Sequence, residues 1–206
     1  MPVPSGATIR SRVRQPAERL TEMVLRDQPR SRAITVFLDG LPRAVRVEAL
    51  TSLVGPLLQS RFYAALVDAP PVRLVDLVPP EVPPLREVVF QGKNSALAFT
   101  FFQTRFCRPS DRSDMLWGFH RQALAWLTGP GYFVVQEGLG GAAMDYREVP
   151  RGRCGTWPIV RSNDRGLSRF VYGGMVDHIR RASQDVFIGS AHRDGKATGN
   201  YFILWR

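Results

Sequence analysis

The sequence predicts an α+β protein, mainly β with N-terminal helices, in which an antiparallel meander closes into a β-barrel and the helices pack against it. Three observations predict this class. Apolar residues recur at helical spacing early in the chain, they alternate with period two after Leu85, and turn signals separate the alternating runs. Short connections favour antiparallel neighbours, and closure removes the exposed edges of a large sheet.

The chain divides into an arm, a helical segment and a barrel. Residues 1–15 are rich in Pro, Gly, Ser and Arg and lack periodicity, which predicts a flexible basic arm. Residues 16–84 carry the helical signals and a Pro-rich connector, and residues 85–206 carry the strand signals. Because 206 residues are enough to bury a substantial core, we expect residues 16–206 to form one structural domain.

The helical segment has three parts. An amphipathic helix is expected to start at Pro16, whereas "AITVFLDGLP" predicts a short strand or the start of a loop because it combines β-branched residues with an Asp-Gly turn. "VEALTSLVGPLLQSRFYAAL" predicts two helical pieces with a bend at Gly55-Pro56. Three proline pairs then mark "DAPPVRLVDLVPPEVPPL" as an extended connector with room for an edge strand.

Eight strand-like runs follow Leu85. They are "LREVVFQG", "SALAFTFFQTRFC", "MLWGFHRQALAWL", "YFVVQE", "AAMDYREV", "SRFVYGGMVDHIRR", "DVFIGSAH" and "NYFILWR". The third run also fits a helix, and an α+β fold with a curved sheet around that helix is the structural alternative.

The inner faces of these strands supply the candidate ligand contacts. Each run offers large apolar side chains with one or two polar groups, which is typical of a small-molecule pocket but also of a barrel filled by its own side chains. If one parity of each strand faces inward, the candidate contacts are Phe99, Phe101, His120, Gln122, Trp126, Tyr132, Met175, Ile179, Tyr201 and Trp205.

The end of the chain carries a family resemblance. The order of a strand, "FIGSAHRDG" and a terminal aromatic strand "YFILWR" resembles the closing strands of lipocalin-like, or calycin-like, barrels across the C-terminal half. The N-terminal Gly-x-Trp motif of true lipocalins is not evident. The resemblance implies binding of hydrophobic compounds and, in a minority of such barrels, cyclisation or isomerisation of polyene or polyketide-like substrates. It transfers no functional residue.

Several kinds of site lack sequence support. The three histidines fall on three different predicted strands and no Gly-x-Ser-x-Gly elbow is present, which argues against a hydrolase. Nothing beyond their number supports a metal site. The glycines of "EGLGGAAMDY" precede a predicted strand and not a helix, so they indicate a hairpin turn and not a phosphate-binding loop. No cofactor is expected.

General acid–base chemistry needs only one desolvated titratable side chain, and the candidates are Asp177, His178, Glu137, His120 and the Asp145-Tyr146 pair. Asp177 and His178 are adjacent on a predicted strand, so they point to opposite faces and do not form a dyad. Met175 and Ile179 share a face with Asp177, which favours Asp177 as the inward residue.

The overall charge raises the question of partners. The formal net charge is +10, but the basic residues are scattered arginines apart from Lys93 and Lys196, and no nucleic-acid reader motif accompanies them. No apolar run is long enough for a membrane helix and the N-terminus lacks a signal-peptide core, so we expect no membrane span and a cytoplasmic location. Cys107 and Cys154 are not at zinc-ligand spacing and are expected to be free, with a disulfide between them as the alternative.

The leading hypothesis is a barrel that binds a hydrophobic small molecule, with or without cofactor-independent cyclase or isomerase activity. The alternatives are a protein-interaction domain with a filled barrel and a nucleic-acid-binding protein that uses the Arg-rich N-terminus. A homo-oligomer is compatible with each of these hypotheses.

Overall fold

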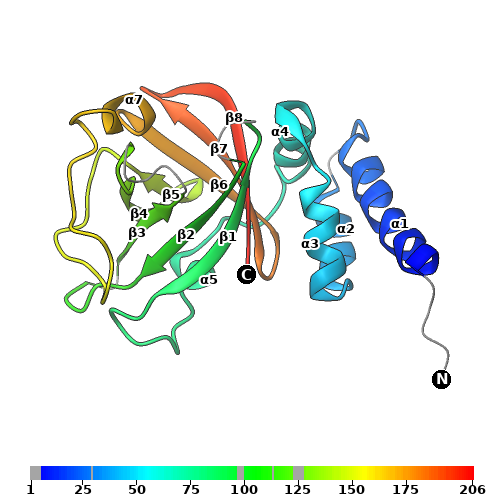
Figure 1. The fold of residues 1–206 in the computed structure, drawn as a ribbon, viewed down its shortest axis with the longest axis horizontal. Helices are drawn as coiled ribbons and strands as arrows, with labels where there is room; N and C mark the ends of the chain where they lie inside the picture. The colour runs from blue at the N-terminus through cyan, green and yellow to red at the C-terminus, as the bar shows by residue number, and fades with distance from the viewer. Residues whose placement is uncertain (1–5, 29, 97–99, 113, 123–127) are drawn as a thin grey trace.

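Eight antiparallel strands close into a barrel in the computed structural model of the chain (Figure 1), which describes residues 6–28, 30–96, 100–112, 114–122 and 128–206, with residues 6–14 described by their backbone. Each strand pairs with the next, and the last pairs with the first. This confirms the predicted fold class. The strands are β1 (Val88–Asn94), β2 (Phe101–Cys107), β3 (Met115–Arg121), β4 (Tyr132–Gly138), β5 (Gly141–Asp145), β6 (Met175–Ser183), β7 (Val186–Arg193) and β8 (Lys196–Trp205).

The N-terminal helices cover one outer face of the barrel, the face formed by β6, β7 and β8 (Figure 1). Ile34 and Phe62 from the helices are fully buried in one cluster with Ile188 and Ile203 from the strands. The barrel wall is therefore apolar on both sides here. The helices are α1 (Gly6–Val24), α2 (Ser31–Asp39), α3 (Arg43–Thr51), α4 (Gly55–Ala65), and the short α5 (Leu74–Leu77) and α7 (Ser168–Val171).

The helical segment corrects one prediction and confirms another. The strand or loop expected in "AITVFLDGLP" is wrong, because Ala33 to Asp39 belong to α2 and the turn begins only at Gly40. Ile34 and Leu38 lie one helical turn apart and are both fully buried, so packing of this face outweighs the β-propensity of the segment. The two helical pieces around Gly55-Pro56 are confirmed as α3 and α4. Helix α1 begins at Gly6, so much of the expected arm lies within a helix.

Other boundaries also differ from the sequence-based expectation. The Pro-rich connector contains the helical turn α5, and none of its residues pairs as an edge strand. The run "SRFVYGGMVDHIRR" divides into α7 and β6, with Gly174 at a φ of 69° between them. Strand β3 ends at Arg121, and the following residues 123–127 lie outside the described part of the chain.

Inward-facing glycines make room for aromatic rings inside the barrel. A Cβ atom on Gly189 would lie 2.0 Å from the ring of Phe202, and one on Gly118 would lie 2.2 Å from the ring of Phe133. Each phenylalanine therefore lies across the glycine of the neighbouring strand, which lets large rings fill a narrow lumen. The three such cross-strand pairs are Gly92 with Phe102, Gly118 with Phe133, and Gly189 with Phe202.

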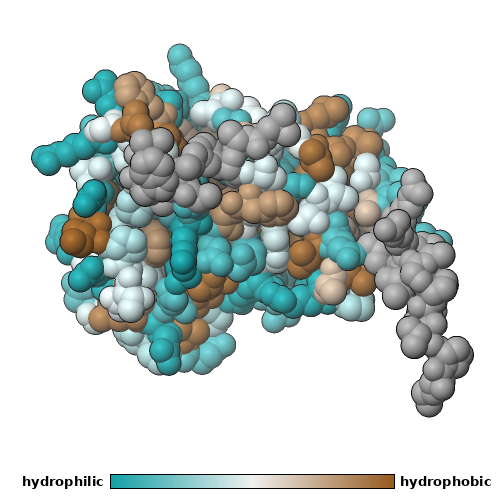
Figure 2. Space-filling model, in the orientation of Figure 1, coloured by the Kyte–Doolittle hydropathy of each residue, from teal (hydrophilic) through white to brown (hydrophobic). Residues whose placement is uncertain are grey.

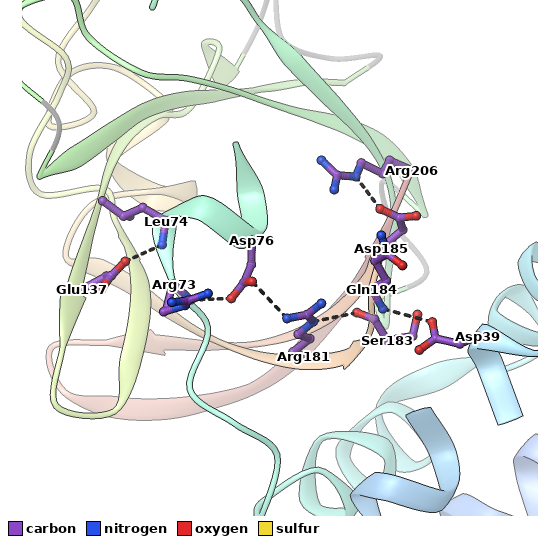
Figure 3. Close-up of polar contacts among 10 residues, drawn as sticks. All are labelled: Asp39, Arg73, Leu74, Asp76, Glu137, Arg181, Ser183, Gln184, Asp185 and Arg206. Atoms are coloured by element: carbon purple, nitrogen blue, oxygen red, sulfur yellow. Dashed lines mark hydrogen bonds and ion pairs between the residues drawn. The ribbon is translucent and has the colours of Figure 1, made fainter. Parts of the chain in front are cut away.

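One end of the barrel is closed by α5. Leu74 and Leu77 pack in the same core cluster as Phe106, Phe187 and Leu204 from the strands. Polar contacts fix this plug (Figure 3). The Leu74 amide donates to Glu137, and Asp76 accepts from both the Arg73 amide and the Arg181 guanidinium. The open space of the lumen is therefore confined to the opposite end.

The outer surface is mixed in character. Hydrophobic residues on the face shown in Figure 2 lie in small groups among hydrophilic ones. Cys107 and Cys154 are free and buried, in an outer cluster with Phe119, Tyr132 and Trp157. Over the ranges described above, the helices lack the combination of length and apolar character that a bilayer crossing requires.

Candidate functional site

A cavity of about 190 Å³ occupies the end of the barrel next to α7. Aromatic side chains form much of its wall, and Met175, Val171 and Ala191 add aliphatic surface. The aromatic residues that line the cavity are Phe102, His120, Tyr146, Tyr172, Tyr201 and Phe202, and the ring of Tyr201 also packs against Tyr63 of the N-terminal helices. This cavity has the composition of a small-molecule site, an apolar wall with a few polar groups.

A buried chain of hydrogen bonds crosses the cavity wall from β2 to β6. The Thr104 hydroxyl lies 2.9 Å from His120 Nδ1, and His120 Nε2 lies 2.5 Å from the Tyr146 hydroxyl. The Tyr146 hydroxyl donates to Asp177 Oδ2 at 3.0 Å. Four side chains from separate strands and one loop are therefore linked in a row that ends at a carboxyl group.

Burial controls the protonation of this chain. Desolvation lowers the pKa of His120 to about 3 and raises the pKa of Asp177 to about 7, while the hydrogen bond from Tyr146 opposes the rise. His120 is therefore neutral at physiological pH. Because Tyr146 donates to Asp177, His120 donates from Nε2 and accepts from Thr104 at Nδ1 when Asp177 is ionised.

The second oxygen of Asp177 has no hydrogen-bond partner among the described residues. Oδ1 is buried and makes no hydrogen bond within the described residues, and Asp177 lines the cavity. Buried polar atoms normally have partners, so an orphan oxygen at a cavity wall requires an explanation. The simplest one is that Oδ1 receives a hydrogen bond from whatever occupies the cavity.

A second polar group lies beside this chain. Gln122 Nε2 donates to the Tyr172 hydroxyl at 2.8 Å and to the Thr128 hydroxyl at 3.0 Å. The rings of Tyr146 and Tyr172 stack with centroids 5.6 Å apart. Burial raises the pKa of Tyr146 and of Tyr172, so both tyrosines that line the cavity are neutral.

The structure brings several of the predicted residues together. His120, Gln122, Met175, Asp177 and Tyr201 all line the cavity. A further predicted contact, Ile179, faces the same side of β6 but lies deeper, in the core cluster.

Other predicted ligand contacts lie elsewhere. Phe101 is 61% exposed, Tyr132 packs in the outer cluster with Trp157, and Trp205 packs against the N-terminal helices. In β2, β4 and β8 the opposite parity faces the lumen, so the inward side chains are those of Phe102, Phe133 and Phe202. Phe99 and Trp126 lie outside the described residues.

Two of the acid–base candidates, His178 and Glu137, lie outside the cavity. His178 is on the outer face of β6, where its ring meets that of His192 with centroids 4.7 Å apart. Glu137 has the inward parity of β4 but lies at the plugged end, where its carboxylate accepts the Leu74 amide at 2.6 Å (Figure 3). Asp177 lines the cavity, as do the candidates His120 and Tyr146.

Some residues of this site were missed by the sequence analysis. Thr104, Tyr172, Phe102 and Phe202 were not among the candidate contacts, and Tyr146 was considered only beside Asp145. The pairing of Thr104 with His120 across β2 and β3 follows from strand register, which the sequence leaves open. Tyr172 reaches the cavity because α7 precedes β6, whereas the sequence pattern predicted a continuous strand.

Comparisons with protein-family models, curated proteins and solved structures found no match to this chain. The closed eight-stranded antiparallel barrel is consistent with the architecture that the lipocalin-like resemblance implied. Among the described residues, no group of three or more His, Cys, Asp or Glu side chains is placed to hold a metal ion.

Proposed function

We propose that this protein binds a small, largely apolar molecule of single-ring size in the cavity, with one polar group of the ligand directed at Asp177. The observation that carries the proposal is the orphan oxygen of Asp177 at the wall of a cavity that is lined mainly by aromatic and aliphatic surface, with Asn94, Gln122 and Asn200 as further polar residues. A ligand that fills the space and donates one hydrogen bond would satisfy the buried oxygen and cover the aromatic surface.

The size of the cavity limits the ligand. An apolar protein cavity of about 150 Å³ accommodates benzene, whereas sites for drug-sized ligands span about 300–1,000 Å³. The cavity here, at about 190 Å³, fits one substituted ring. We therefore propose a ligand smaller than the polyene or polyketide-like substrates that the family resemblance implied.

A thermal-unfolding screen with single-ring compounds tests this proposal. A compound present at about 100 times its Kd stabilises the folded state by about 2.7 kcal/mol, which raises Tm by several degrees. Ala191→Leu should abolish the shift because Ala191 lines the cavity and is buried, whereas Ala197→Leu, on an exposed part of β8, should preserve it. The proposal is wrong if no compound raises Tm, or if Ala191→Leu binds as well as the unchanged protein.

Proton transfer on a bound ligand is a second candidate function, favoured by the pKa of about 7 at Asp177. A carboxyl group with such a pKa can remove a proton from one carbon of a β,γ-unsaturated ketone and return it to another, which moves the double bond into conjugation without a cofactor. 3-Cyclohexenone is a suitable probe, because its conjugated product absorbs in the ultraviolet. Isomerisation that is equally fast with Asp177→Asn would exclude Asp177 as the base.

A further inference from the structure

The charges around the cavity are unusual for this chain. Among the described residues that line it, Asp177 carries the carboxyl group and none is Lys or Arg, although the chain has 28 basic residues and a net charge of +10. Residues 1–5, 29, 97–99, 113 and 123–127, which the structure does not describe, have no ionisable side chains in the sequence. A basic protein thus places an acid at the wall of its cavity, without a basic partner in the part of the lining that the structure describes.

The groups that face Asp177 are all neutral. Tyr146 donates to Oδ2, and Tyr172 and His120 are the other titratable groups on this wall. On the neighbouring strands, Met144 of β5 and Ala191 of β7 stand opposite Asp177 in register. The ring of His120 is held between Thr104 and Tyr146, so it does not act as a counter-ion.

We propose that the ligand is a small organic cation, a single ring that carries a protonated amine, and that the ammonium group donates to Asp177 Oδ1 between the aromatic walls. This proposal rests on the proposed function, because it assumes that the cavity binds a single-ring compound. An ionised carboxyl group buried without a counter-ion is costly, and an ammonium group supplies both the missing charge and the missing hydrogen bond. Aromatic residues in the cavity lining add attraction for a cation.

The same geometry disfavours other ligand classes. A carboxylate or phosphate ligand would lie beside the Asp177 carboxyl group with no lysine or arginine in the described lining to compensate. A neutral alcohol can donate to Oδ1 but leaves the charge of Asp177 unpaired. The site is therefore expected to rank an amine above an alcohol, and an alcohol above a carboxylate.

Binding of a cation should depend on the protonation of Asp177. The pKa of Asp177 is about 7 in the empty site, and the facing groups Tyr146, Tyr172 and His120 stay neutral at mildly acidic to mildly alkaline pH. Because an alkyl ammonium group keeps its proton past pH 8 or so, affinity should fall about tenfold for each pH unit below 7 and level off above it.

Calorimetric titration with benzylamine, benzyl alcohol and benzoate at about pH 8 tests the proposal, since the three probes share a ring and one further carbon. We expect benzylamine to bind at least about tenfold more tightly than benzyl alcohol, because charge-assisted hydrogen bonds are roughly twice as strong as neutral ones, and benzoate not to bind. Asp177→Asn should lower the affinity for benzylamine to that for benzyl alcohol, and it should leave the affinity for benzyl alcohol nearly unchanged. Glu137→Gln, which changes an acid at the plugged end, is the matched control and should affect none of the probes.

The outcomes separate the two proposals. If benzyl alcohol binds as tightly as benzylamine, or if Asp177→Asn leaves benzylamine affinity unchanged, the cation proposal is overturned while the cavity remains a binding site. If none of the three probes binds and no single-ring compound raises Tm, the proposed function fails as well. The pH series on the unchanged protein decides the question even if the variant does not fold, since pH-independent benzylamine affinity between about pH 5.5 and 8 contradicts the proposal.

Discussion

The two ends of the barrel use acidic side chains in opposite ways. At the plugged end, Glu137 accepts the Leu74 amide at 2.6 Å, and Asp76 accepts the Arg73 amide at 2.8 Å and Arg181 at 3.0 Å. At the open end, Asp177 receives one hydrogen bond from Tyr146 and its other oxygen has no partner in the described structure. At the plugged end, backbone amides and a guanidinium satisfy the carboxylates. At the open end, one carboxyl oxygen has no hydrogen-bond partner among the described residues.

This contrast distinguishes acidic side chains that stabilise the fold from an acidic side chain that is available to a ligand. A carboxylate satisfied by amides and a guanidinium stabilises its own segment, and it has little capacity left for a ligand. A buried carboxyl group with a free oxygen destabilises the empty protein, and the loss is recovered when a ligand binds. Asp76 and Glu137 should therefore act on stability, and Asp177 on binding.

The largest expected effect is a pH-dependent change in stability on substitution of Asp177. Burial raises its pKa from 3.8 to about 7, so between these values the folded state holds a proton that the unfolded chain has released, and stability falls as pH rises. At about 1.4 kcal/mol per unit of pKa, the loss reaches about 4 kcal/mol. Relative to the unchanged protein, Asp177→Asn should gain about this amount between pH 4 and 8, as measured by urea unfolding followed by tryptophan fluorescence.

His120 provides the internal control for that measurement. Its pKa is lowered to about 3 by burial, so the unfolded chain takes up a proton below about pH 6.5 that the folded state does not, and stability rises with pH over this range. The two opposing slopes should nearly cancel in the unchanged protein between about pH 4 and 6.5. In Asp177→Asn only the contribution of His120 remains, so the free energy of unfolding should rise with pH over this range. A stability difference that stays constant over the whole pH range would show that Asp177 is not the titrating group.

The plugged end should show a smaller effect that does not involve ligand. Asp76→Ala removes the acceptor for the Arg73 amide and the partner of Arg181, and we expect it to destabilise the fold by about 3 kcal/mol. The measurement is urea unfolding, with the Tm shift caused by a single-ring ligand as the second readout. That shift should persist, since Asp76 does not line the cavity. Loss of ligand binding with unchanged stability would reverse the assignment of the two ends.

The sequence allowed the fold class and much of the strand order to be predicted, because period-two patterns and turn residues are local signals. Local pattern also identified Asp177, since Met175 and Ile179 lie on its face while His178 and Arg180 lie on the other. Parity was wrong in β2, β4 and β8, where large apolar side chains occur on both faces of the strand. There, Tyr132 and Trp205 are buried outside the barrel, by a loop cluster and by the helices.

The hydrogen-bonded chain could not be predicted for a different reason. Thr104, His120, Tyr146 and Asp177 are far apart in the sequence, and only the register of their strands brings them into line. The prediction of a strand or loop for the α2 segment was wrong because its β-branched residues favour a strand locally. Burial of Ile34 and Leu38 against the barrel favours a helix instead. Tertiary contacts decide both cases.

The smallest expected effect compares two glycines inside the barrel. Gly118→Ala and Gly189→Ala should each destabilise the protein by about 2 kcal/mol, because a new Cβ would meet the ring of Phe133 or Phe202. Phe202 lines the cavity and Phe133 does not, so only Gly189→Ala should push a ring into the ligand space and weaken single-ring binding by about tenfold. Calorimetric titration measures the difference. Equal loss of affinity in both variants would mean that general loosening of the barrel, and not the position of Phe202, controls access to Asp177.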